Sequence, residues 1–330
     1  MDKNTALETF YKNNSIDPIQ VNDPQSDCYD RHLADLPDKV DQWLLKVPPK
    51  DRDVFLQLLS KYTYLRRAQC QLRYVKILAN LEDHLSAANM DISQTLIITV
   101  EAGGAYASGG DNVRTDLLAR TFEYVNKKQV VAAQSRLEED ELHKYQAILF
   151  LDDVIGSGVT LWGTICYLKD RFPEWFGRQK IFCGSIAPRS RGVKHIKDNC
   201  KREKISIEWL HDLDWIQQPA FANNSAEFKI LEPYERLIGE YMTEEDITFF
   251  MGFQKNRLLL SFYYNTPNNT LSTFWRIGPE TKPLFYRNGN QVSPKRPALS
   301  DLRTQKKQMS QQAYSFGTDR WRHKCNGDPT

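Results

Sequence analysis

The sequence predicts an α/β fold in which helices flank a parallel sheet, and three observations support this prediction. Short apolar runs rich in β-branched residues recur between residues 95 and 210, as is typical of buried strands. Segments with helical character separate these runs, and glycine-rich or polar loops follow several of them. Such alternation is typical of parallel sheets, whose ligands bind outside the carboxyl ends of the strands.

Individual elements follow from the same patterns. The expected strands are 95–100, 129–133, 147–151, 181–187 and 205–210. Helices are expected at 113–125 and 160–171, between successive strands. The loops at 101–110, 152–160 and 188–192 each follow a strand, so we expect them to meet at one edge of the sheet.

The part before the sheet has a helical pattern. Val40, Trp43, Leu44 and Val47 are spaced as one face of a helix, and the prolines at 48 and 49 end it. Further helices are expected after Asp51 and over 66–84, while the polar first 34 residues are expected to be irregular.

The pattern changes again after residue 212. A short helix around 246–252, an apolar strand at 258–264 and a turn at 265–270 are expected there. The predicted divisions are an irregular arm (1–34), a helical cap (35–92), the α/β core (93–215), a C-terminal hood (216–290) and a polar, basic tail (291–330).

Composition excludes several classes of protein. The 330 residues carry 44 Lys and Arg against 42 Asp and Glu, so the net charge of +2 does not favour nucleic-acid binding by the whole chain. The six cysteines form no C-x-x-C pair, which argues against zinc sites and disulfide scaffolds. No apolar run approaches the roughly 20 residues of a membrane helix, so a cytoplasmic location without membrane contact is expected.

The most informative segment is Ile148–Leu161, an apolar strand followed by two aspartates, a Gly-Ser-Gly turn and the start of a helix. The turn brings backbone N–H groups and a helix N-terminus to one point, which favours a bound anion. Glycines at 156 and 158 let a phosphate approach the backbone. The predicted phosphate-binding residues are Gly156, Ser157, Gly158, Val159 and Thr160.

Asp152 and Asp153 stand just before this anion cradle. Carboxylates are strong acceptors for sugar hydroxyls, so a ribose phosphate would suit the whole segment. The alternative is an ordinary strand-to-helix turn with two aspartates at its start. Adjacent carboxylates repel each other, and a purely structural turn does not need both of them.

The segment 148–161 resembles the signature of type I phosphoribosyltransferases over its whole length, without a gap. The resemblance implies that Asp152 and Asp153 are catalytic-site residues that contact the 3′- and 2′-hydroxyls of phosphoribosyl pyrophosphate. It also implies that the turn holds the 5′-phosphate and that Mg²⁺ binds mainly through the substrate, with no direct protein ligand. The reaction would be transfer of a pentosyl group, with pyrophosphate leaving from C1′ through an oxocarbenium-like state.

The same family binds pyrophosphate through a loop after the first strand. The candidates here are Glu101, Ala102, Gly103 and Gly104 and, further on, Ser108, Gly109 and Gly110. Basic side chains would neutralise the leaving group, and the candidates are Arg114, Arg189 and Arg191, with Lys127, Lys128 and Arg136 in the same region. A surface position is the alternative for each of them.

One departure from the family pattern concerns the catalytic loop between the second and third strands. Ser135–Tyr145 occupies this place and carries four consecutive acidic residues at 138–141. An acidic lid over pyrophosphate is unexpected.

A second, looser resemblance covers about residues 40–290. The segment Phe262–Leu271, together with Trp275 and 283–287, looks like the C-terminal region of phosphoribosyltransferase-like effectors of prokaryotic anti-phage systems, including retron-associated ones. This resemblance implies a defence function and a hood that contacts the second substrate. A simple hairpin turn is the alternative for 265–270.

Three hypotheses follow. The first is a transferase that uses phosphoribosyl pyrophosphate and Mg²⁺. The second is a binding module that regulates a protein or nucleic-acid partner without turnover. The third is a subunit that binds nucleic acid through Arg303, Lys306, Lys307, Arg320, Arg322 and Lys324 of the tail.

Overall fold

The computed structural model describes residues 1–45, 47–100, 129–132, 137, 142–240, 250–276 and 283–287. These residues fall into two compact units: 1–70 with 217–287, and 71–216. The expected helices at 113–125 and 246–252 lie wholly or mostly outside the described residues.

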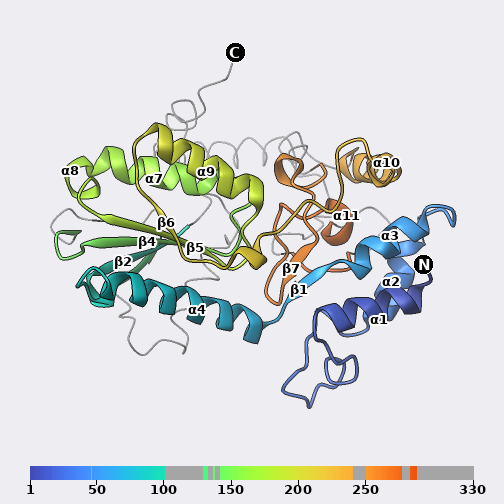
Figure 1. Ribbon diagram of the computed structural model, residues 1–330. Helices are drawn as coiled ribbons and strands as arrows, with labels where there is room; N and C mark the ends of the chain where they lie inside the picture. The colour runs from blue at the N-terminus through green and yellow to red at the C-terminus, as the bar shows by residue number, and fades with distance from the viewer. Residues whose placement is uncertain are drawn as a thin grey trace, which may run out of the picture. The chain divides into compact units, whose positions relative to one another are not determined.

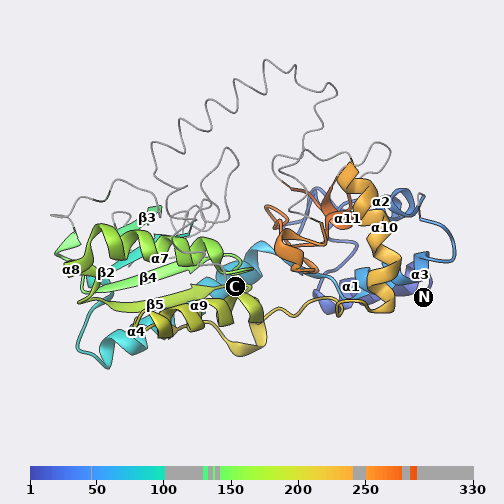
Figure 2. The ribbon, with the colours of Figure 1, turned by 90° about the horizontal axis from the view of Figure 1, so that it is seen from above.

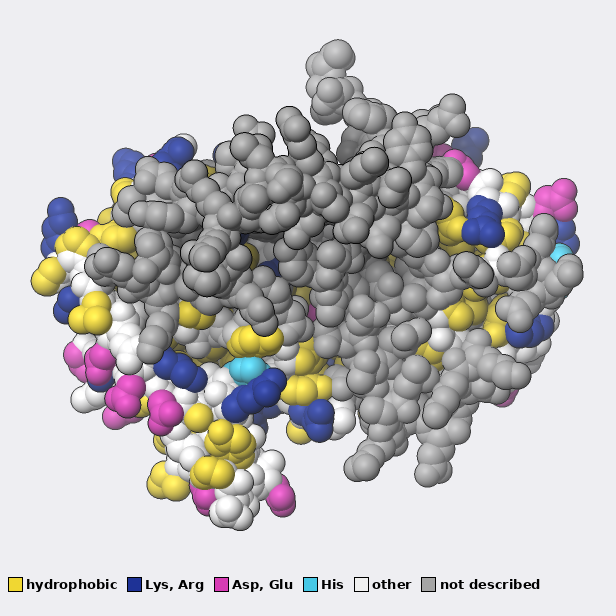
Figure 3. All heavy atoms as spheres, turned by 180° about the vertical axis from the view of Figure 1, so that it is seen from behind, with side chains coloured by type: hydrophobic (Ala, Val, Ile, Leu, Met, Phe, Trp, Pro, Cys, Tyr) yellow, Lys and Arg dark blue, Asp and Glu magenta, His cyan; other side chains and the backbone are white. Residues whose placement is uncertain are grey.

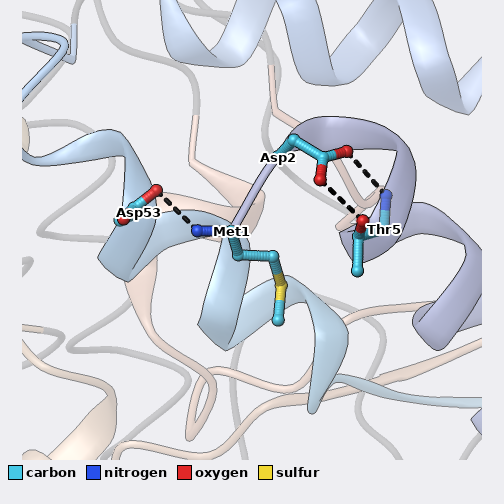
Figure 4. A network of polar contacts seen from close by, with 4 residues as sticks. All are labelled: Met1, Asp2, Thr5 and Asp53. Atoms are coloured by element: carbon cyan, nitrogen blue, oxygen red, sulfur yellow. Dashed lines mark hydrogen bonds and ion pairs between the residues drawn. The ribbon is translucent and has the colours of Figure 1, made fainter.

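The first unit begins with three helices, α1 (Lys3–Asn13), α2 (Leu36–Leu44) and α3 (Arg52–Ser60). Asp2 caps α1 by accepting the Thr5 N–H at 3.0 Å, and the Met1 ammonium lies 2.8 Å from Asp53 Oδ1, as Figure 4 shows. α1 lies in the segment expected to be irregular. It forms there because Ala6, Leu7, Phe10 and Tyr11 bury one face.

Segments from both ends of the chain build this unit. The later part contributes α10 (Ala226–Glu240), a 3₁₀ turn (Phe253–Lys255), β7 (Leu260–Phe262) and α11 (Ser272–Trp275). β1 (Thr63–Leu65) pairs with β7 in parallel, with Thr63 opposite Leu260. The first unit therefore includes residues from the predicted arm, helical cap and C-terminal hood.

Aromatic side chains fill the core of the first unit. Tyr62 stacks on Phe285 at 4.3 Å, and Trp43 contacts Phe274 at 5.0 Å between ring centroids. Trp43 also donates its Nε1–H to the Thr273 carbonyl at 2.8 Å, which ties α2 to α11. The two ends of the chain therefore stabilise each other through one core.

The second unit is a five-stranded sheet in the order β3-β2-β4-β5-β6, with every neighbouring pair parallel. The strands are β2 (Thr95–Thr99), β3 (Val130–Ala132), β4 (Ala147–Asp152), β5 (Lys180–Ser185) and β6 (Glu208–Trp209). The helices are α4 (Arg67–Ser86), α7 (Val159–Arg171), α8 (Pro173–Phe176) and α9 (Ser190–Arg202), with 3₁₀ turns at Ile92–Gln94 and Leu213–Trp215.

Helices cover both faces of this sheet. Figure 1 shows α7 and α9 on one face and α4 on the other, and Figure 2 shows β3, β2, β4 and β5 side by side in that order. β4 lies in the middle and all six of its residues are buried, which explains its continuous apolar sequence. These features confirm the predicted α/β fold with a helix-flanked parallel sheet.

The helices and the surface charges bear on the predictions about membrane contact and net charge. None of the helices in the described part of the chain combines the length and apolar character needed to cross a bilayer. The described side chains visible in Figure 3 include both basic and acidic types, in line with the small net charge.

Candidate functional site

The two aspartates lie at the carboxyl end of β4, at the carboxyl edge of the sheet. Asp152 is the last residue of the strand and lies opposite Ser185 of β5. Val100 donates its N–H to Leu151 O at 3.0 Å, so the chain leaving β2 starts beside the same point. Edges of this kind bind ligands in open parallel sheets.

Both carboxylates are buried, and they belong to consecutive residues. Asp152 is 9% exposed and Asp153 is 8% exposed, and the Asp153 N–H donates to Asp152 Oδ1 at 2.9 Å. Burial raises the pKa of Asp152 well above its ordinary value, and the nearby charge of Asp153 raises it further. A ligand that brings hydroxyl donors or positive charge would relieve this penalty.

The turn after the aspartates has the geometry expected of an anion cradle. Gly158 has a φ of +81° and caps the thirteen-residue helix α7. The first N–H groups of such a helix have no acceptor within the helix, and its dipole favours a negative charge at this end. Ser157 Oγ accepts the Val159 N–H at 3.4 Å, while Thr160 is exposed. The structure thus brings the five predicted phosphate-binding residues next to the aspartates.

The segment after β5 is hydrogen-bonded to the turn that follows the aspartates. Ala187 N–H and Ser185 Oγ both donate to Asp153 O, at 2.9 and 3.0 Å. Arg189 donates its N–H to Ile155 O at 3.0 Å, and its side chain is buried. Of the two predicted arginines that follow β5, Arg189 therefore lies against the turn, whereas Arg191 is exposed on the first turn of α9.

Sequence reasoning missed three residues of this support. Ser185 and Ala187 carry no motif, and only their place after the strand in parallel with β4 could have indicated them. Arg73 of α4 donates to the Ile186 carbonyl and lies over the Trp215 ring at 4.8 Å. No local pattern predicts this long-range contact.

Several predicted residues lie outside the described part of the chain. They are the glycine-rich candidates 101–110, the basic residues Arg114, Lys127, Lys128 and Arg136, and the acidic residues 138–141. Their roles stay predictions. Within the described residues, no group of three His, Cys, Asp or Glu could hold a metal ion.

The polar segment 265–270 has contacts inside the first unit. Thr266 Oγ1 donates to Tyr286 O at 2.6 Å, and Thr270 Oγ1 donates to Leu260 O at 2.6 Å. Asn265 and Phe262 form an antiparallel bridge. These contacts give the segment a structural role as a turn, and its role as a hood over a second substrate stays a prediction.

Comparison with known proteins gives one match. A family model described as PRTase-CE matches residues 40–287, which is more than half of the chain. None of the curated proteins and none of the solved structures matches the sequence.

Proposed function

Because the chain belongs to the PRTase-CE family, which is phosphoribosyltransferase-like, we propose that it binds phosphoribosyl pyrophosphate or a related ribose phosphate at 152–160. The observation that carries the proposal is the buried aspartate pair at the end of β4, immediately before a glycine-capped helix N-terminus. The helix-flanked parallel sheet is consistent with a phosphoribosyltransferase-like fold.

Each part of the site has a role in the proposal. Asp152 and Asp153 accept hydrogen bonds from the 3′- and 2′-hydroxyls of the ribose. The N–H groups and hydroxyls of 156–160 hold the 5′-phosphate. The hydroxyl donors of the sugar would lower the cost of two buried neighbouring charges and would therefore lower the raised pKa of Asp152.

The proposal includes Mg²⁺ that is bound through the substrate. Carboxylate oxygens suit a hard cation, but the two aspartates are buried and serve the ribose in this proposal. When bound through the substrate, Mg²⁺ would supply positive charge that offsets the charge of the pyrophosphate leaving group. The aspartates themselves orient the sugar and place negative charge near C1′ as positive charge develops there.

The proposed activity is transfer or hydrolysis of the ribosyl phosphate group, in an effector of a prokaryotic defence system such as a retron. The looser resemblance over about 40–290 supports the defence role. Release of pyrophosphate from phosphoribosyl pyrophosphate, measured with and without cell extract as a source of acceptor, tests turnover. Release that disappears in Asp153→Asn supports an enzyme.

A second candidate is a regulatory module that binds the ligand without turnover, as part of a protein or protein–nucleic-acid defence complex. The four consecutive acidic residues at 138–141 favour it, since they stand where the family's catalytic loop is expected. Tight ligand binding with no pyrophosphate release in the presence of cell extract would select this candidate over the enzyme.

A further inference from the structure

The turn 152–158 rests on the segment 185–192, which follows β5 and opens α9. Three hydrogen bonds join the two segments at Asp153 O and Ile155 O. Arg73 in turn holds the segment 185–192, because its side chain donates a hydrogen bond to Ile186 O. These bonds from 185–189 all end on carbonyl groups of the turn and on none of its N–H groups.

Gly192 lies close to the backbone of Ile155 and Gly156. A Cβ atom on Gly192 would stand 2.5 Å from both Ile155 O and Gly156 O. Atoms at such distances overlap, and both carbonyls belong to the backbone and cannot rotate away as a side chain would. A Cβ on Gly158 would in turn stand 2.8 Å from Gly192 O, so the two glycines face each other closely.

Backbone conformation does not explain a glycine at 192. The residue belongs to α9, and positive φ among described glycines occurs at Gly158 and Gly252. Glycine in a helix costs about 1 kcal/mol relative to alanine. The close approach to the turn is therefore the physical reason for a glycine at this position.

We propose that Gly192 is a positioning residue for the ligand, an inference that rests on the proposed function of the turn. Because Gly192 has no side chain, the first turn of α9 can pack directly against the backbone of Ile155 and Gly156. Any side chain at 192 would displace the turn 152–158 from α9, and this displacement would move the N–H groups that hold the 5′-phosphate.

Two other glycines of the same unit provide matched controls. A Cβ on Gly184 would meet Ile77 Cγ2 at 2.7 Å and Leu151 Cδ1 at 3.2 Å, so Gly184→Ala perturbs packing against α4 and β4, and its nearest new contacts lie outside residues 152–158. A Cβ on Gly163 in α7 would have no atom within 4 Å. Gly184→Ala reports a general loss of packing, and Gly163→Ala reports a harmless added methyl group.

The test is calorimetric titration of phosphoribosyl pyrophosphate with Mg²⁺ into wild type and the three variants, below their melting temperatures. We expect Gly192→Ala to weaken binding on the order of 10- to 100-fold, as displaced binding groups do. The two control variants should bind within about threefold of wild type, as substitutions away from a site do. Wild-type affinity in Gly192→Ala, or an equal loss in Gly184→Ala, would overturn the proposal.

Hydrogen exchange without ligand separates this inference from the proposed function. We expect faster exchange over residues 150–162 in Gly192→Ala than in Gly184→Ala. If wild type does not bind, the proposed function fails, and unchanged exchange then also overturns the role of Gly192. If Gly192→Ala does not fold, Ser185→Ala removes the hydroxyl bond to Asp153 O, and wild-type affinity and exchange in that variant overturn the proposal.

Discussion

Asp152 is placed where its charge is costly in the absence of a ligand. It is buried at the end of a fully buried strand, next to a second carboxylate. Such groups lower the stability of a protein and persist where binding needs them. The same residue that would serve the ribose should therefore reduce the stability of the free chain.

Asp152→Asn tests this trade-off. We expect the free energy of unfolding at pH 7 to rise by about 1 kcal/mol, because the neutral amide removes a buried charge repulsion. The folded-state pKa is raised, so the carboxyl penalises folding at high pH, and the gain should vanish below the ordinary value of 3.8. Chemical denaturation at several pH values measures this. Asp198→Asn, at an exposed ion pair, is the control, and an equal gain there would contradict the account.

Glu235 is a second buried carboxyl, in the first unit. It accepts the N–H groups of Met251 and Thr273 at 2.9 and 2.8 Å, and burial raises its pKa to about 7. The hydrogen bonds partly offset the effect of burial. One side chain of α10 thus joins two later segments of the chain.

The raised pKa of Glu235 predicts a pH dependence of stability. Its contribution is fully present below the ordinary pKa of 4.5 and is lost as the pH rises through about 7. At about 1.4 kcal/mol per pH unit, this amounts to about 3 kcal/mol. Glu235→Gln, which stays neutral, should lose most of this slope between pH 5 and pH 8. Urea unfolding curves measure it, and a slope equal to that of wild type would contradict the assignment.

At the scale of elements, the sequence predicts those helices, strands and turns whose formation depends on a local residue pattern. The strand, turn and helix of 147–171 are confirmed almost to the residue, because an apolar strand, two glycines and a helical face each leave a local signal. The pairing of β1 with β7 was not predicted, since two three-residue strands far apart in the chain share no local pattern. α1 was missed although Leu7, Phe10 and Tyr11 have helical spacing, because polar residues dominate the segment.

The packing of α2 on α11 yields a prediction at this scale. Trp43→Phe keeps an aromatic ring but loses the Nε1–H bond to Thr273 O, so the free energy of unfolding should fall by about 1 to 2 kcal/mol more than the lost volume explains. Trp175→Phe is the comparison, since Trp175 Nε1 is buried without a hydrogen-bond partner in the described structure. Equal losses in the two variants, measured by chemical denaturation, would contradict this role of the bond.

At the scale of the whole molecule, the first unit draws its core from both ends of the described chain. Phe10 contacts Phe285 at 5.9 Å, and Asn14 Oδ1 accepts the N–H of Tyr64 in β1 at 2.7 Å. The segment 1–34 therefore supports elements more than 200 residues later. Composition alone could not show this, because burial of a few apolar residues depends on the tertiary fold.

Removal of residues 1–34 tests this dependence. The shortened chain should lose several kcal/mol of stability in its first unit, since truncation of one buried Phe alone costs about 3 to 5 kcal/mol. Thermal unfolding followed by near-ultraviolet circular dichroism measures the loss. An unchanged melting temperature would show that the segment is a dispensable arm.

The central claim is that the buried aspartates bind a ribose phosphate. Calorimetric titration of phosphoribosyl pyrophosphate with Mg²⁺ into wild type, Asp152→Asn/Asp153→Asn and the Asp198→Asn control tests it most directly. The account predicts saturable binding by wild type and the control, and none by the folded double variant. No binding by folded wild type, or equal binding by the double variant, would contradict it.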